Sequence, residues 1–111
     1  MAIYVSNIVI EQGYDFDTSF QLEDTRTNSF LNLTSYSTEA KLRKHYESST
    51  AVSFGSTVTT AELGIISISL TSSQTLELKP GRYVFDVKIS TQGKDFKAVE
   101  GSALVRAGVT R

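Results

Sequence analysis

Polar and apolar residues alternate along several short stretches of this chain, and this alternation limits the possible folds more than any other feature. Residues 14–22 (YDFDTSFQL) and 82–91 (RYVFDVKIST) follow the two-residue period of a strand that buries one face. Residues 64–70 (GIISISL) repeat the pattern. On this basis Asp15 and Asp17 are expected on the solvent side of a half-buried strand.

Further strands are predicted at residues 3–10, 51–60 and 96–105, the first with a change of phase at Ser6 and Asn7 and the second with a bend at Gly55. Residues 37–46 (STEAKLRKHY) fit a strand by alternation and a helix by propensity, and the neighbouring strands favour a strand. Hydroxyl residues followed by Pro80 and Gly81 predict one short helical turn near residues 72–78.

About seven strands separated by turns predict an all-β fold, a single immunoglobulin-like β-sandwich. A chain of 111 residues is long enough for one domain around one core, so residues 1–111 are expected to form one unit. The inward positions of the predicted strands name the expected core: Phe16, Phe20, Leu22, Leu42, Ile66, Ile68, Leu70, Tyr83, Phe85, Val87 and Ile89.

Composition excludes several classes of function. The chain has no cysteine, so it has no disulfide, thiolate metal site or cysteine nucleophile. Its net charge of −1 gives it no overall attraction to nucleic acid or to an anionic membrane, and neither is expected as a partner. No apolar run approaches the roughly 20 residues of a membrane-spanning helix, and the N-terminus lacks the features of a secretory signal. Synthesis in the cytoplasm is expected.

Few residues suggest chemistry. His45 is the one histidine, and its neighbours Arg43 and Lys44 favour a solvent-facing position over catalysis. Asp15, Asp17, Glu23 and Asp24 could supply oxygens to calcium, but their spacing matches no calcium-binding loop, and exposed strand faces commonly carry such acids. No metal, cofactor or catalytic residue is therefore expected, and the protein is not expected to be an enzyme.

Two further groups of residues favour structural interpretations. The cluster Lys41, Arg43 and Lys44 suits a solvated strand or an ionic contact with a partner subunit. Tyr83 follows Pro80 and Gly81 at the start of a strand, where it can fill the core or bond its hydroxyl to nearby backbone, as in the tyrosine corner of sandwich folds.

Several segments, in this order, carry a resemblance to a known family. The most telling are Leu33-Thr34 before the third strand, the turn Thr75-Leu76-Glu77-Leu78, the Gly-x-Tyr-x-x-Asp pattern of Gly81, Tyr83 and Asp86, and the ending Val109-Thr110-Arg111. The chain from about Gly13 onward resembles the small immunoglobulin-like β-sandwich domains of tailed-bacteriophage structural proteins, similar to the N-terminal domain of baseplate upper proteins.

The resemblance implies a non-enzymatic virion protein, associated with a tail, baseplate or neck and assembled with other virion proteins and with copies of itself. Capsid decoration is an alternative position. A different class of function also stays open, a β-sandwich that binds carbohydrate or a cell surface. Its candidate contacts are the aromatic residues Tyr4, Tyr36 and Tyr46.

The first predicted strand is a candidate for assembly contacts. A sandwich leaves edge strands whose backbone groups can pair with a neighbouring chain. Ile3, Val5, Ile8 and Ile10 form an apolar set near the N-terminus. We therefore expect residues 1–11 to be an edge strand or an arm exchanged between copies, with these four residues as the assembly edge.

Overall fold

The computed structural model describes residues 4–24, 29–45, 47 and 51–110, and strands account for most of them. Two short helices interrupt the strands, the 3-10 helix η1 (Ala61–Leu63) and α1 (Ser72–Leu76). The strands are β1 (Tyr4–Val5), β2 (Ile8–Glu11), β3 (Phe16–Gln21), β4 (Glu23–Asp24), β5 (Ser29–Phe30), β6 (Ser37–Arg43), β7 (Val52–Thr60), β8 (Ile65–Leu70), β9 (Gly81–Thr91) and β10 (Lys94–Arg106).

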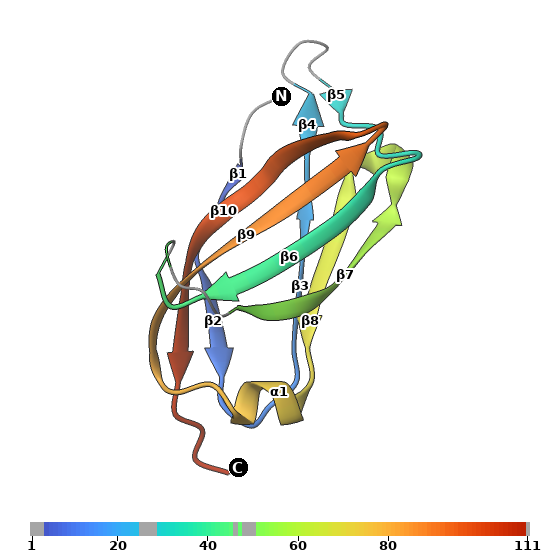
Figure 1. The fold of residues 1–111 in the computed structure, drawn as a ribbon. Helices are drawn as coiled ribbons and strands as arrows, with labels where there is room; N and C mark the ends of the chain where they lie inside the picture. The colour runs from blue at the N-terminus through green and yellow to red at the C-terminus, as the bar shows by residue number, and fades with distance from the viewer. Residues whose placement is uncertain (1–3, 25–28, 46, 48–50, 111) are drawn as a thin grey trace.

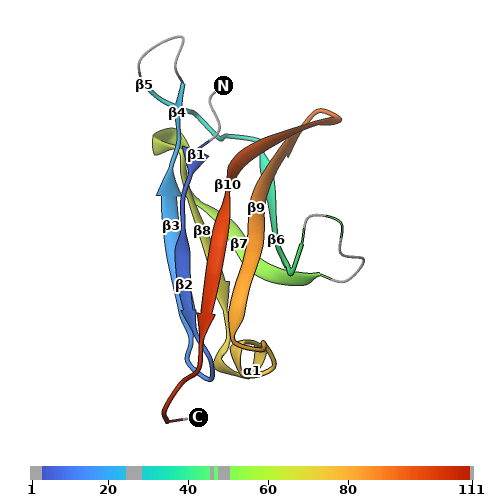
Figure 2. The same cartoon turned by 90° about the vertical axis from the view of Figure 1, so that its left-hand side faces the viewer.

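The main strands follow one hydrogen-bonded path, β1-β10-β9-β6-β7-β8-β3, with β2 also paired to β10. Strand β7 joins two layers. Its first part, as far as Phe54, pairs with β6, and the part from Gly55 onward pairs with β8. One layer holds β1, β2, β10, β9 and β6, and the other holds β8 and β3 with the second part of β7 (Figures 1 and 2).

This grouping is that of an immunoglobulin-like sandwich, in which the third, sixth and seventh strands of the domain form one sheet against the others. Here β6, β9 and β10 take those places, and β1 and β2 run parallel to β10. The prediction of an all-β sandwich of about seven strands is confirmed. The ambiguous segment is the strand β6, paired with both β7 and β9, so tertiary pairing outweighs its helix formers.

The core lies between the two layers. Phe20 from one layer stacks on Phe85 from the other, with ring centroids 6.3 Å apart, and Phe54 meets Phe85 edge-on at the same distance. Phe16 and Tyr83 are partly buried against this core. The other expected core residues are buried: Phe20, Leu22, Leu42, Ile66, Ile68, Leu70, Phe85, Val87 and Ile89.

Helix α1 forms where the short helical turn was predicted. Thr71 caps it, since its hydroxyl accepts from the Gln74 amide while the Gln74 side chain accepts from the Thr71 amide. A third contact comes from another element: Asp15 Oδ1 accepts a hydrogen bond from the Ser72 amide at 2.7 Å. Asp15 thus connects the start of β3 to the first turn of α1.

The predicted first strand is broken at Ser6 and Asn7, as its change of phase indicated. Both residues of the break are hydrogen-bonded to β10. The Ser6 amide donates to the Glu100 carbonyl, and Asn7 Oδ1 accepts from the amide and hydroxyl of Ser102. Gly101 permits this close approach, because a Cβ there would overlap the carbonyl oxygen of Ser6.

Burial divides the four residues of the expected assembly edge. Ile8 and Ile10 are buried in the core of their own chain, because β2 pairs with β10 in the register that turns both side chains inward. Val5 is 72% exposed, and Ile3 lies outside the described residues. Among the described residues, then, only Val5 of the expected edge is on the surface.

Three smaller features of the fold differ from the strand pattern expected from the sequence. Tyr14 is exposed, because the chain turns through residues 12–15 before β3 begins at Phe16. Helix η1 was not predicted, and it closes on Gly64 in the left-handed conformation. Ala98 and Val99 are both buried, because β10 shifts its register against β9 between Lys97 and Val99.

No helix in the described ranges is long and apolar enough to cross a membrane.

Candidate functional site

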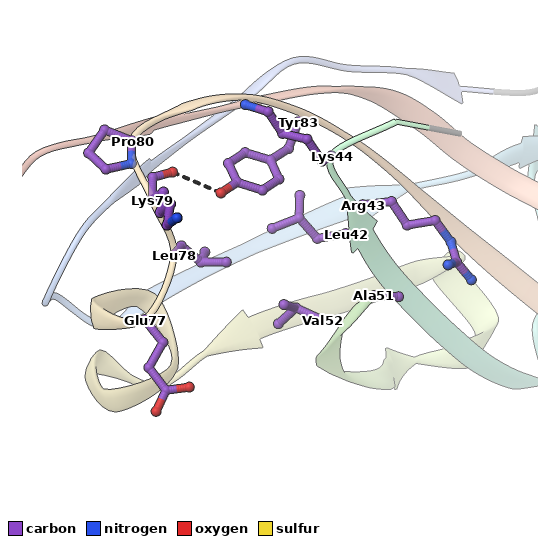
Figure 3. A pocket seen from close by; sticks show the side chains of 10 residues that line it. All are labelled: Leu42, Arg43, Lys44, Ala51, Val52, Glu77, Leu78, Lys79, Pro80 and Tyr83. Carbon is purple, nitrogen blue, oxygen red and sulfur yellow. Dashed lines mark hydrogen bonds between the residues drawn. The ribbon is translucent and has the colours of Figure 1, made fainter. Parts of the chain in front are cut away.

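A hollow of about 530 Å³ lies at one end of the sandwich, where the end of β6 and the start of β7 face the segment between α1 and β9 (Figure 3). Segments far apart in the sequence form it, so no single motif predicts it. Its lining residues are Leu42, Arg43, Lys44, Ala51, Val52, Glu77, Leu78, Lys79, Pro80 and Tyr83.

The floor of the hollow is apolar. Leu42 and Leu78 belong to the buried core, and Val52 and Tyr83 pack against that core while staying partly exposed. In Figure 3, Leu42 and Val52 face Leu78 of the α1–β9 segment, and the ring of Tyr83 lies beside Leu42. A ligand group that covered this floor would bury apolar surface, which favours binding.

Tyr83 fixes one wall. Its hydroxyl donates a hydrogen bond to the Lys79 carbonyl at 2.8 Å, four residues upstream, which is the tyrosine-corner contact. The two alternatives for this residue are therefore both realised, since the ring packs on the core while the hydroxyl bonds the backbone. The contact holds the Lys79–Pro80 turn against the start of β9.

The rim carries more positive than negative charge. Lys44 lies over the Tyr83 ring, with Nζ 4.8 Å from the ring centroid, at a distance suited to a cation–π contact. Lys79 adds a second cation and Glu77 one acid, whereas the guanidinium of Arg43 points away from the hollow in Figure 3. The surface cluster Lys41, Arg43 and Lys44 is thereby divided, because Lys41 and Arg43 lie together on the outer face of β6 while Lys44 lies over Tyr83 in the hollow.

The second surface is the outer face of the layer that contains β1, β2, β10, β9 and β6. Val9 and Leu104 are register partners on β2 and β10 and are 50% and 36% exposed. Val5 lies further along the same face, beside Glu100. We call Val5, Val9 and Leu104 the apolar row.

Ion pairs cover the same outer face on β6 and β9. Glu39 lies 3.3 Å from Lys41 Nζ and 3.5 Å from Lys88 Nζ, and Asp86 lies 3.9 Å from Lys97 Nζ on β10. The hydrogen bond from Lys41, followed by the charges of Lys41 and Lys88, holds the pKa of Glu39 below its usual value. We call these five residues the ionic ladder.

The acids considered for calcium do not gather. Asp17 is exposed on β3, Asp15 caps α1, and Glu23 is exposed on β4. The Asp24 side chain is outside the described part of the chain. Within that part, no three His, Cys, Asp or Glu side chains are placed to hold a metal ion together.

The remaining candidates are dispersed as well. His45 is exposed in the connection after β6, as expected from its neighbours. Tyr36 is partly buried against the core, while Tyr46 and the side chain of Tyr4 lie outside the described residues. The described lining of the hollow contains no serine, cysteine or histidine, and its polar side chains are those of Arg43, Lys44, Glu77, Lys79 and Tyr83.

Sequence reasoning missed Val9 and Leu104, although a signal was present. Val9 stands between Ile8 and Ile10, and Leu104 stands between Ala103 and Val105. Because successive side chains of a strand point to opposite faces, three apolar residues in a row cannot all face the core. The hollow had no comparable signal, because the sandwich has to form before β6 and the α1–β9 segment meet.

No protein-family model matches this chain, and no curated protein matches it either. Two solved structures are similar in shape. InlP of Listeria monocytogenes is 14% identical with a TM-score of 0.49, over 91% of this chain and 26% of that one. A family 123 glycoside hydrolase from Clostridium perfringens is 12% identical with a TM-score of 0.44, over 100% of this chain and 24% of that one.

The chain thus spans about a quarter of the length of each of these proteins. At these identities and scores neither likeness carries an argument about function.

Proposed function

We propose that this chain is a non-enzymatic structural protein of a tailed-bacteriophage particle, associated with the tail, baseplate or neck, and that it acts through contacts with other proteins. The ordered motifs of the sequence support the family, and they fall on the framework of the sandwich. Gly81, Tyr83 and Asp86 lie on β9, and Thr75 to Leu78 form the end of α1 and the turn after it.

The observation that carries the proposal is the apolar row beside the ionic ladder on one outer face. Val5, Val9 and Leu104 are exposed although each is large enough to stabilise a core. Grouped apolar side chains on a surface, rimmed by polar residues, are typical of protein–protein interfaces. The ladder beside them supplies charges of both signs, which give a contact its register and specificity.

The position of the apolar row also suits assembly. It follows β1, β2 and β10, and the described residues show β2 hydrogen-bonded to β10 alone. The row therefore lies at the margin of a layer, where a neighbouring subunit has access to side chains and to strand backbone together.

The experiment is a density-gradient fractionation of lysate from the producing source, with mass spectrometry of the particle fractions. We expect several copies of the chain in each particle. Particles assembled with Val9→Ser or Leu104→Ser should contain fewer copies, while the purified variants keep the melting temperature of the parent. Thr57→Ala, an exposed change on β7 in the other layer, is the matched control.

A chain that stays in the soluble fractions would contradict the proposal. A glycan array would then test the other class of function, since a saturable signal there favours a carbohydrate-binding module. Equal incorporation of all three variants would show that the apolar row is not the contact.

A further inference from the structure

We infer that the hollow between β6 and the α1–β9 segment is a binding site for a short extended peptide in which an apolar side chain is flanked by carboxylates. Such a peptide would be a segment of another structural protein of the particle. That identity of the partner rests on the proposed function, whereas the chemistry of the site does not.

The size and floor of the hollow set the apolar part of the ligand. A volume of about 530 Å³ is within the usual range of ligand pockets, about 300–1,000 Å³. The floor is made by Leu42, Val52, Leu78 and the ring of Tyr83. Tyr83 and Val52 keep part of their surface exposed, so a leucine-sized side chain placed there would cover it.

The charges on the rim determine which charge is expected on the ligand groups that flank the apolar side chain. Two cations, Lys44 and Lys79, stand around the hollow against the single acid Glu77. The whole chain has a net charge of −1, so this excess of positive charge is local to the hollow. Carboxylates on either side of an apolar group complement such a rim, and lysines in the same positions would be repelled.

The side of the site formed by the α1–β9 segment is also held in shape before any ligand binds. The Tyr83 hydroxyl bonds the Lys79 carbonyl, and Thr75 at the end of α1 bonds the turn between β2 and β3. These contacts fix the wall that carries Lys79 and Pro80. A rigid wall lowers the ordering cost of binding, which favours recognition of a peptide that is flexible when free.

The test uses the purified full chain, labelled with 15N, and the peptide Ac-EELLEE-NH2. We expect saturable shifts of the amides of Lys44, Val52 and Leu78. Lys44→Glu and Lys79→Glu should each weaken binding about tenfold, because each reverses a rim charge. Lys94→Glu, at the tip of the β9–β10 hairpin, makes the same change in net charge away from the hollow and should leave the affinity unchanged.

The matched peptide Ac-KKLLKK-NH2 should give no saturable shift. Three results would overturn the inference: no local shift from the acidic peptide up to about 1 mM, equal binding of the two peptides, or tighter binding of single-stranded DNA than of the acidic peptide. Failure here leaves the particle experiment unaffected. Peptide binding by a chain absent from particles would instead keep the site and reject the structural role.

Discussion

At the scale of single residues, the buried hydroxyl of Thr75 connects helix α1 to the turn between β2 and β3 through hydrogen bonds. Its side chain is 0% exposed; Oγ1 accepts from the Gly13 amide at 3.0 Å and lies 2.8 Å from the Tyr14 carbonyl. Thr75→Val keeps the shape and leaves the Gly13 amide without this acceptor. We expect a loss of about 1–3 kcal/mol in the free energy of unfolding, measured by urea denaturation.

The control for this prediction is Thr57→Val, the same change at an exposed position on β7. It should change the free energy of unfolding by less than about 0.5 kcal/mol. If Thr75→Val is as stable as the parent, then the Gly13 amide has another partner, and the connection between α1 and the β2–β3 turn contributes nothing.

A second residue-scale prediction concerns the backbone contact at Gly101. Gly101→Ala places a methyl group against the Ser6 carbonyl, so β10 or the β1–β2 break has to move. We expect a loss of about 1–3 kcal/mol or more in the free energy of unfolding. Gly55→Ala is the comparison, because a Cβ there meets only Ser69 Oγ as its near neighbour, at 3.1 Å, and should cost less. A reversed order of the two variants would contradict this account.

At the scale of elements, the sequence predicted what depends on alternation and missed what depends on how elements meet. The strands β8 and β9 and the turn α1 were predictable, because periodicity and capping are local. The run from Ile8 to Ile10 indicated that part of it leaves the core face, but it has no period that says whether Val9 or its two neighbours do so. The hollow requires β6 and the α1–β9 segment to be placed together, which only the packed sandwich does.

The ionic ladder gives a prediction about β6 and β9 as a pair. Because Lys41 and Lys88 hold the pKa of Glu39 below its usual value, the folded state binds fewer protons than the unfolded state in that acid range. Glu39 therefore contributes stability above its unfolded pKa, and that contribution disappears as the pH falls through its folded pKa. Glu39→Gln should melt slightly lower than the parent at neutral pH, and the difference should vanish once the pH has fallen below the folded pKa of Glu39.

Melting curves followed by circular dichroism across this range measure the difference. Glu62→Gln, on the exposed helix η1, makes the same change outside the ionic ladder and serves as the control. A Glu39→Gln difference that stays constant on acidification would mean that packing, and not the charge of Glu39, connects β6 to β9 at this point.

At the scale of the whole molecule, the N-terminal segment decides whether the chain is a closed sandwich or a sandwich with a detachable arm. Ile10 is 0% exposed between the layers, while its neighbour Val9 faces out. Ile10→Ala should lower the free energy of unfolding by about 2–5 kcal/mol. Val9→Ser should leave it nearly unchanged, so the two variants separate the core role of this strand from its surface role.

Removal of residues 1–11 extends the same argument to the whole segment. Without β1 and β2, β10 loses a parallel partner and the core loses Ile8 and Ile10, so we expect the truncated chain to lose its cooperative urea transition. A synthetic peptide of residues 1–13, added in trans, should restore the transition, because it can pair with β10 in the native register. The same peptide with Ile8 and Ile10 replaced by serine should not. If the truncated chain unfolds like the full one without any peptide, then residues 1–11 are a peripheral arm, which would favour the expected assembly edge at Ile8 and Ile10.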